Sequence, residues 1–185
     1  TNGIDLELNY ENNTNFGLLN LGLRGTHILE YKIPGINGSV IDVVGLFNHD
    51  NFARSLPETK IVLNTSLSNN NHTFSLFGRY ISDYSTTRPL SSAAKSAGFN
   101  QKIDQWLTFD IQYSYSLALS GNEIRLSIGG NNILDKDVPI VYDAANFSYD
   151  PKHHDPRGRL IYFGLKLFSL LTFFTYTFSI LIEVI

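Results

Sequence analysis

The chain has 185 residues, a length compatible with one ordinary domain, and carries a formal net charge of −3. It has no basic run, which argues against a nucleic-acid partner. Charged residues make up only 17% of the chain while Phe, Trp and Tyr make up 13%, a balance that suits β-strands and membrane interfaces. The absence of cysteine excludes disulfides and thiolate metal sites without indicating a compartment.

Alternation of apolar and polar residues predicts a series of β-strands. The clearest segment runs from Leu107 to Leu117, where Leu, Phe, Ile and Tyr alternate with Thr, Asp, Gln and Ser. Successive side chains of a strand point to opposite faces, so such a segment has one apolar and one polar face. The same pattern recurs over residues 4–10, 19–30, 61–68, 73–80 and 123–128. We therefore expect two-faced antiparallel strands, and no helical period is convincing before the tail.

The predicted connections are alternately short and long. They fall at residues 11–15, 33–58, 69–71, 82–103, 120–122 and 134–157. Outer-membrane barrels have tight periplasmic turns and extended extracellular loops, which is the same parity. By this parity the last strand, residues 159–167, runs to the periplasmic side.

Aromatic residues gather at the two ends of these strands and predict two interfacial girdles. The members are Tyr10, Phe16, Phe74, Tyr113 and Tyr115 at the turn ends, and Tyr31, Tyr80, Tyr84 and Trp106 at the loop ends. The alternative is that aromatic residues simply favour strands.

A soluble β-sandwich would also alternate. Two features count against it: the polar faces carry charged residues in mid-strand, as a water-filled lumen permits, and the apolar faces are nearly free of charge, as lipid requires. His27 is the main exception, and it lies near the loop end of its strand, where an interface could hydrate it.

The segment Gly129–Phe168 carries a specific set of motifs. Asn-Asn-Ile-Leu-Asp-Lys stands at 131–136, Asp-Pro-Arg-Gly-Arg at 155–159 and Tyr-Phe-Gly-Leu-Lys at 162–166. This spacing resembles the closing end of a TonB-dependent outer-membrane receptor, and weaker likenesses extend back to Thr1. The resemblance implies an all-β fold, an antiparallel up-and-down transmembrane β-barrel. Residues 1–168 would then be a fragment supplying about the last seven of about 22 strands.

The resemblance also implies a function and a location. It implies active uptake of a scarce nutrient, such as a ferric siderophore, cobalamin or an oligosaccharide, across the outer membrane of a Gram-negative bacterium. Expected partners are outer-membrane lipid, a small nutrient ligand and the TonB complex, which such receptors contact through an N-terminal plug that this chain lacks. A signal sequence upstream of Thr1 is expected, because none is visible here. The alternatives are a passive porin-type channel and a soluble β-sandwich binding module.

Candidate sites are few, and we expect no catalytic, cofactor or metal site. Asp150–Asp155, with His153 and His154, is the one metal-capable cluster, but its prolines and the family likeness favour a structural loop. The strand histidines, His27 and His72, offer no arrangement for hydrolysis.

Two further groups of residues have open interpretations. Four mid-strand charges are expected to form cross-strand pairs in a lumen, and the alternative is that they form part of a translocation path. These charges are Arg24, Asp110, Glu123 and Arg125. Four aromatic residues in or beside the long loops could either stack on a sugar or siderophore ring or anchor the loops. They are Tyr84, Tyr142, Phe147 and Tyr149.

After Leu167 the alternation breaks, and the tail, residues 169–185, departs from the family pattern. Ser169 stands where a terminal aromatic is expected, and residues 170–185 are an apolar stretch, rich in Thr, Phe and Ile, with a single charge at Glu183. This stretch is slightly short for a membrane-spanning helix. We expect a frame error or read-through, with a helical C-terminal anchor as the alternative.

Overall fold

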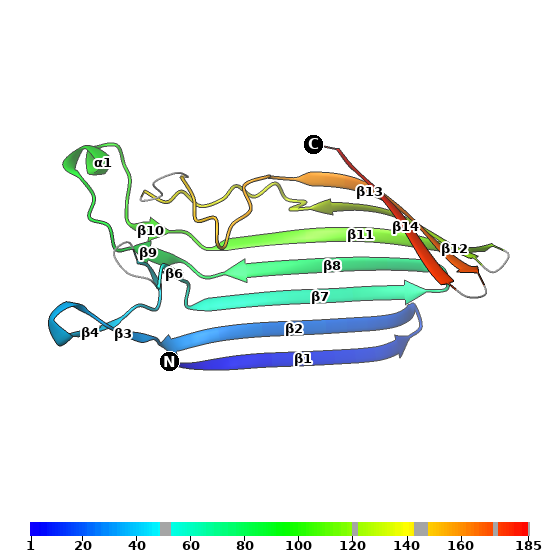
Figure 1. Ribbon diagram of the computed structural model, residues 1–185, viewed down its shortest axis with the longest axis horizontal. Helices are drawn as coiled ribbons and strands as arrows, with labels where there is room; N and C mark the ends of the chain where they lie inside the picture. Colours follow the sequence, from blue (N-terminus) through cyan, green and yellow to red (C-terminus); the bar gives the residue numbers. More distant parts are fainter. Residues whose placement is uncertain (49–52, 120–121, 143–147, 172–173, 185) are drawn as a thin grey trace.

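The computed structural model (Figure 1) describes residues 1–48, 53–119, 122–142, 148–171 and 174–184, and from residue 169 onward it describes the backbone alone. An eight-stranded antiparallel sheet has the order β1-β2-β7-β8-β11-β12-β13-β14. Its strands are β1 (Asn2–Thr14), β2 (Gly17–Glu30), β7 (Thr59–Asn69), β8 (His72–Ile81), β11 (Trp106–Leu119), β12 (Asn122–Asn131), β13 (Leu160–Leu171) and β14 (Phe174–Val184). The predicted all-β, antiparallel class is confirmed.

The strands run up and down, each pairing with the next long strand in the chain. Figure 1 shows the short turns together at one end of the sheet and the long connections at the other, as the alternating lengths predict. Local chemistry explains the tight turns. Asn70, between β7 and β8, has φ 51°, a left-handed conformation that asparagine tolerates. Gly17 opens β2 with φ 126°, and a Cβ there would lie 2.3 Å from the Ser68 carbonyl oxygen.

The strand register gives the sheet two chemically distinct faces. Leu126 of β12 stands between Tyr115 and Leu165, whereas its neighbour Arg125 stands between Ser116 and Lys166. We call the first side the apolar face and the second the polar face. The apolar face carries many exposed large side chains: Ile4, Leu6, Leu8, Tyr10, Leu67, Phe74, Leu107, Tyr113, Leu117, Leu126, Ile128, Phe163, Leu165 and Leu167. The described residues therefore leave this face uncovered.

The three long connections fold together at the loop end of the sheet. Their described parts, within residues 31–58, 82–105 and 132–159, form what we call the loop cap. It contains β3 (Lys32–Pro34), η1 (Ile36–Gly38), β4 (Val40–Asp42), β5 (Leu46–Phe47), β6 (Ser55–Leu56), β9 (Tyr84–Thr86), α1 (Ser92–Ser96) and β10 (Lys102–Ile103). Strands β10, β9, β5 and β6 make a second small sheet, in which β5 pairs parallel to β9. These short elements were not predicted, because each is too short to show a period.

Among the described residues, most buried apolar side chains lie in the loop cap rather than on the long strands. Tyr84, Ile103 and Val141, from three different parts of the chain, pack into one buried cluster with Phe47 against it. Tyr84 is 3% exposed and Trp106 only 5%, so these two residues belong to the interior of the molecule. The prediction that they join a loop-end aromatic girdle is wrong. At the turn end, Tyr10 and Phe74 are exposed on the apolar face as predicted.

The tail is a strand in the structure. β13 continues to Leu171, beyond the predicted end at residue 167, and β14 pairs with it along its length. The register sets Ile180 opposite Leu165 and Ser179 opposite Lys166, so the alternation of the sheet continues through the tail. The prediction that the pattern breaks after Leu167 is wrong, as is the helical alternative, because alternation resumes in β14, where Thr175, Thr177 and Ser179 separate larger apolar residues. The frame error or read-through stays a prediction.

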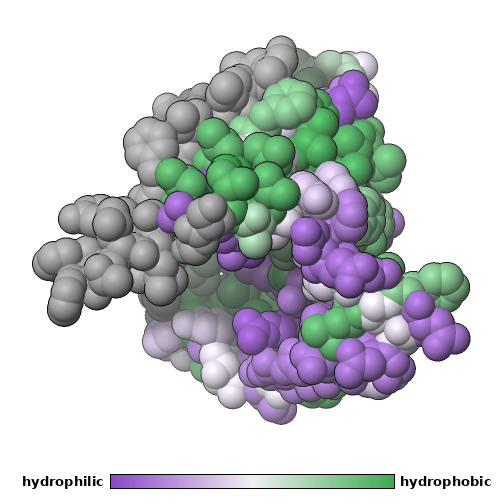
Figure 2. All heavy atoms as spheres, turned by 90° about the vertical axis from the view of Figure 1, so that its right-hand side faces the viewer, coloured by the Kyte–Doolittle hydropathy of each residue, from purple (hydrophilic) through white to green (hydrophobic). Residues whose placement is uncertain are grey.

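Figure 2 looks at the molecule from the end of the short turns. Hydrophilic residues gather in its lower part and hydrophobic residues higher up. Among the described residues, no helix is both long and apolar enough to cross a bilayer.

Candidate functional site

Three of the four charges expected on the polar face take part in two exposed ion pairs. Arg24 of β2 lies 3.0 Å from Glu7 of β1, its direct partner in the register, as a cross-strand pair should. Arg125 also lies 3.0 Å from a carboxylate, but that of Glu123, two residues away on the same strand. The cross-strand prediction is therefore confirmed for Arg24 and wrong for Arg125. Both pairs are well exposed, so each contributes little stability.

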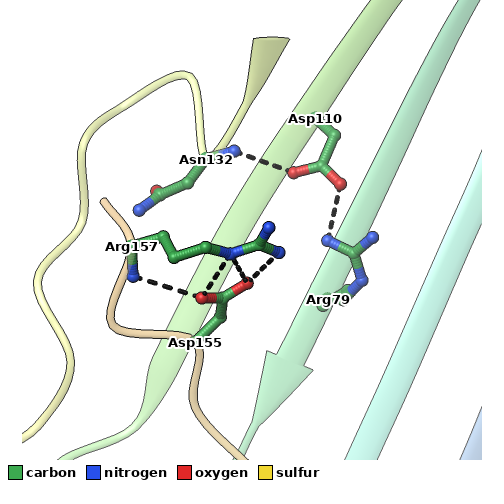
Figure 3. Close-up of polar contacts among 5 residues, drawn as sticks. All are labelled: Arg79, Asp110, Asn132, Asp155 and Arg157. Atoms are coloured by element: carbon green, nitrogen blue, oxygen red, sulfur yellow. Dashed lines mark hydrogen bonds and ion pairs between the residues drawn. The ribbon is translucent and has the colours of Figure 1, made fainter. Parts of the chain in front are cut away.

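The third pair, Asp110 with Arg79, is different because its carboxylate is almost buried. The Asp110 side chain is 10% exposed, and one of its oxygens lies 2.6 Å from Arg79 Nη1. Its other oxygen accepts a 2.8 Å hydrogen bond from the backbone N–H of Asn132, as Figure 3 shows. Charge-assisted contacts to a shielded carboxylate are among the stronger polar interactions in proteins. Asp110 therefore fixes both the Arg79 side chain on β8 and the start of the connection after β12.

The two halves of the sequence motif contact each other. The Asn132 side chain closes a tight turn, donating to the Lys136 carbonyl and accepting from the Lys136 N–H, both at 2.9 Å. Asp135 then accepts a 2.8 Å hydrogen bond from the backbone N–H of Arg159. Residues 131–136 and 155–159 thus begin and end one connection and brace it. These contacts give the separation of the two motif halves in this chain a structural reason.

Between these motif halves, residues 149–158 form a segment that we call the strap. Asp150, only 1% exposed, holds it down: the Tyr84 hydroxyl donates to Asp150 Oδ2 at 2.7 Å. The other carboxylate oxygen accepts from the Lys152 N–H at 3.0 Å. Burial, and then the nearby Asp150 charge, raise the pKa of Tyr84, so its phenol stays a neutral donor.

The two adjacent histidines of the strap serve packing. His154, 4% exposed, lies nearly parallel to the Tyr84 ring at 6.3 Å and meets Trp106 edge-on at 5.3 Å. Burial lowers the pKa of both His153 and His154, which keeps their rings neutral. Within the described part of the chain, no group of three His, Asp, Glu or Cys side chains could hold a metal ion. The contacts of Asp150 with Tyr84 and of His154 with Tyr84 and Trp106 hold this segment against the rest of the molecule.

A polar cavity of about 620 Å³ lies between the strap and the polar face. Its charged lining comes from Arg79 and Asp110 on the sheet and from Lys152, Asp155 and Arg157 on the strap. Asp155 pairs with Arg157 through two carboxylate oxygens, the shortest contact being 2.7 Å (Figure 3), and this pairing lowers the pKa of Asp155. Arg79 and Arg157, each held by a carboxylate, thus lie next to aromatic and amide side chains. Such an arrangement suits the binding of a ligand.

The loop aromatics divide between anchoring and lining roles. Tyr84 is buried under the strap. Tyr142 packs against Phe99 with ring centres 5.7 Å apart and shares a 3.3 Å hydrogen bond with Ser91. Tyr149 lines the cavity, and Phe147 lies outside the described residues. Anchoring is thus observed for Tyr84 and Tyr142.

The strand histidines each have a partner. His27 Nδ1 lies 2.8 Å from the Thr59 hydroxyl, and His72 Nδ1 lies 2.7 Å from the Tyr113 hydroxyl. For His27 this contact with the neighbouring strand satisfies a polar group near the loop end of the apolar face.

Sequence reasoning named part of the cavity lining, Asp110, Tyr149, His153 and His154, but did not predict that these residues lie together. Arg79 lies in the predicted strand 73–80 with no role assigned to it, and Trp106 is predicted at a membrane interface. The one available signal was the charge content of Asp-Pro-Arg-Gly-Arg, which indicated a loop but not what it covers.

Comparison of the chain with protein-family models, with curated proteins and with solved structures found no match.

Proposed function

We propose that this chain forms part of the wall of an outer-membrane β-barrel, and that the barrel is a TonB-dependent receptor importing a scarce nutrient. One observation carries the proposal. The eight-stranded meander has an apolar face whose large side chains are exposed, with Leu126 at 51% and Leu6 at 54%, while the polar face bears ion pairs. In water, such a continuous apolar surface is unfavourable unless something covers it, and lipid covers it without further protein.

The connections support the same proposal. Tight turns lie at one end of the sheet and a folded loop cap at the other, the arrangement of periplasmic turns and extracellular loops. The polar face would then line the lumen, and the cavity under the strap would open towards the substrate path. A barrel of about 22 strands requires strands and a plug beyond those present in this chain.

The strongest support for a receptor, rather than a passive channel, is the family-like connection between β12 and β13. The contacts of Asn132 with Lys136 and of Asp135 with Arg159 give its motif spacing a structural purpose. A soluble sandwich would need a second sheet to cover the apolar face.

Sequencing the gene upstream of Thr1 separates the receptor from the channel. The proposal expects an open reading frame that continues upstream into a plug domain, a TonB-contacting segment and a signal peptide. Further strands without a plug would identify a passive channel, and a start codon directly before Thr1 would contradict both.

A further inference from the structure

The cavity beneath the strap has the features of a ligand site. It measures about 620 Å³ and lies between two walls, the polar face on one side and the strap on the other. This volume lies within the usual range for small-molecule pockets. The strap is held independently of any ligand by the buried contact between Tyr84 and Asp150, so the cavity is preformed.

The cavity has a cationic surplus on its lining. Three basic side chains, Arg79, Lys152 and Arg157, face two acidic ones, Asp110 and Asp155. The Asp110 carboxylate orients Arg79 by holding one guanidinium nitrogen. An arginine has five N–H donors in a rigid fork, and the hydrogen bonds and ion pairs described for Arg79 use only this one nitrogen. Among the described residues Lys152 has no ion pair.

Two buried polar side chains on the same lining lack partners. Thr108, 1% exposed, has a hydroxyl without a hydrogen-bond partner in the described structure, and both ring nitrogens of His154 share this state. Buried polar atoms without partners are uncommon and call for an explanation. A polar ligand in the cavity, with a small adjustment of these side chains, would supply the partners.

We propose that this cavity binds a small molecule bearing an oxyanion, a carboxylate or a phosphate, with Arg79 as its principal contact and Lys152 as a second. Planar guanidinium groups suit such anions because they can donate two parallel hydrogen bonds. An anion site here would specify the ligand class of the proposed receptor. It rests on the proposed function only for the direction from which the ligand arrives.

The test measures binding of citrate and of inorganic phosphate to the full chain in detergent by isothermal titration calorimetry. Lys152→Gln, an exposed change, should weaken binding several-fold. Removing the Arg79 charge should weaken it about tenfold or more, the loss typical of one charge-assisted hydrogen bond. Since Arg79→Gln alone would leave the Asp110 carboxylate buried without its partner, the paired variant Arg79→Gln/Asp110→Asn keeps the test interpretable.

Arg125→Gln is the matched control, because Arg125 is also an ion-paired arginine of the polar face but lies away from the cavity. Its binding should equal that of the unmodified chain. Binding of one anion and not the other identifies the ligand class. No binding of either anion, or equal losses in the Arg125 and Arg79 variants, would overturn the proposal. Neither result bears on which face of the sheet meets lipid, so failure of the anion site and failure of the barrel assignment are distinguishable.

Discussion

At the scale of single residues, the strongest polar contacts of the described structure lie where the loop cap meets the polar face of the sheet. Asp110 and Asp150 are both nearly buried, and each is satisfied by a side chain and a backbone N–H. The exposed pairs along the strands are weak by comparison, because water and salt screen them. Mutations of these two shielded carboxylates should therefore matter more than mutations of the exposed ion pairs along the strands.

Removing the Tyr84 hydroxyl tests the anchor of the strap. Tyr84→Phe leaves Asp150 with one partner fewer in a buried position, and we expect a loss of about 1–3 kcal/mol in the free energy of unfolding. Urea titration of the chain in detergent measures this. Tyr142→Phe, which removes only the longer and exposed contact with Ser91, should cost far less. Equal effects would contradict the anchoring role of Tyr84.

The buried strap histidines should make stability fall in mild acid. Burial lowers the folded-state pKa of His153 and His154 below the ordinary value of about 6.5. As the pH drops below that value, the unfolded chain takes up protons before the folded chain does, so the free energy of unfolding falls. Urea midpoints measured between pH 7.5 and pH 5 should decline, and His154→Phe should reduce the slope. A steeper or unchanged slope in that variant would show that His154 is not the group responsible.

At the scale of elements, the long strands could be predicted from sequence and the cap could not. The alternation over residues 107–117 predicts β11, because every second residue is apolar. This pattern can be recognised from neighbouring residues alone. The strands of the cap are two or three residues long, and β5 meets β9 across a separation that no local pattern reveals. Asp110 was predicted on the polar face, but its pairing with Arg79 depends on the register between β8 and β11. The cavity depends on how the strap folds back.

A close strand contact at Gly129 offers a test of the register of β12 with its neighbours β11 and β13. A Cβ there would lie 2.4 Å from the Tyr162 ring and 2.8 Å from the Ile111 carbonyl oxygen, so Gly129→Ala should destabilise the chain by about 1–3 kcal/mol. Gly25→Ala is a fair control, since the nearest atom there is 3.7 Å away. Denaturant unfolding in detergent compares them. If both substitutions were neutral, the pairing of β12 with β13 would need revision.

At the scale of the whole molecule, the sheet is open. In the described structure β1 pairs only with β2, and β14 only with β13. Lipid cannot satisfy the backbone groups of a free strand edge. We therefore expect this chain alone to give no steady conductance in a planar bilayer, whereas a complete porin measured in parallel does. Stable single-channel currents from the purified chain would contradict this expectation.

The central claim is that the apolar face meets lipid and the polar face meets water. The chain has no cysteine, so single cysteines carrying a nitroxide label report on one position each. In detergent micelles, labels at Leu126 and Leu165 should collide mainly with oxygen, which partitions into the apolar phase. Labels at Ser127 and Lys166 should collide mainly with a water-soluble nickel complex. Alternation of the two accessibilities from residue to residue would support the barrel wall, and labels at Leu126 and Leu165 shielded from both reagents would contradict it.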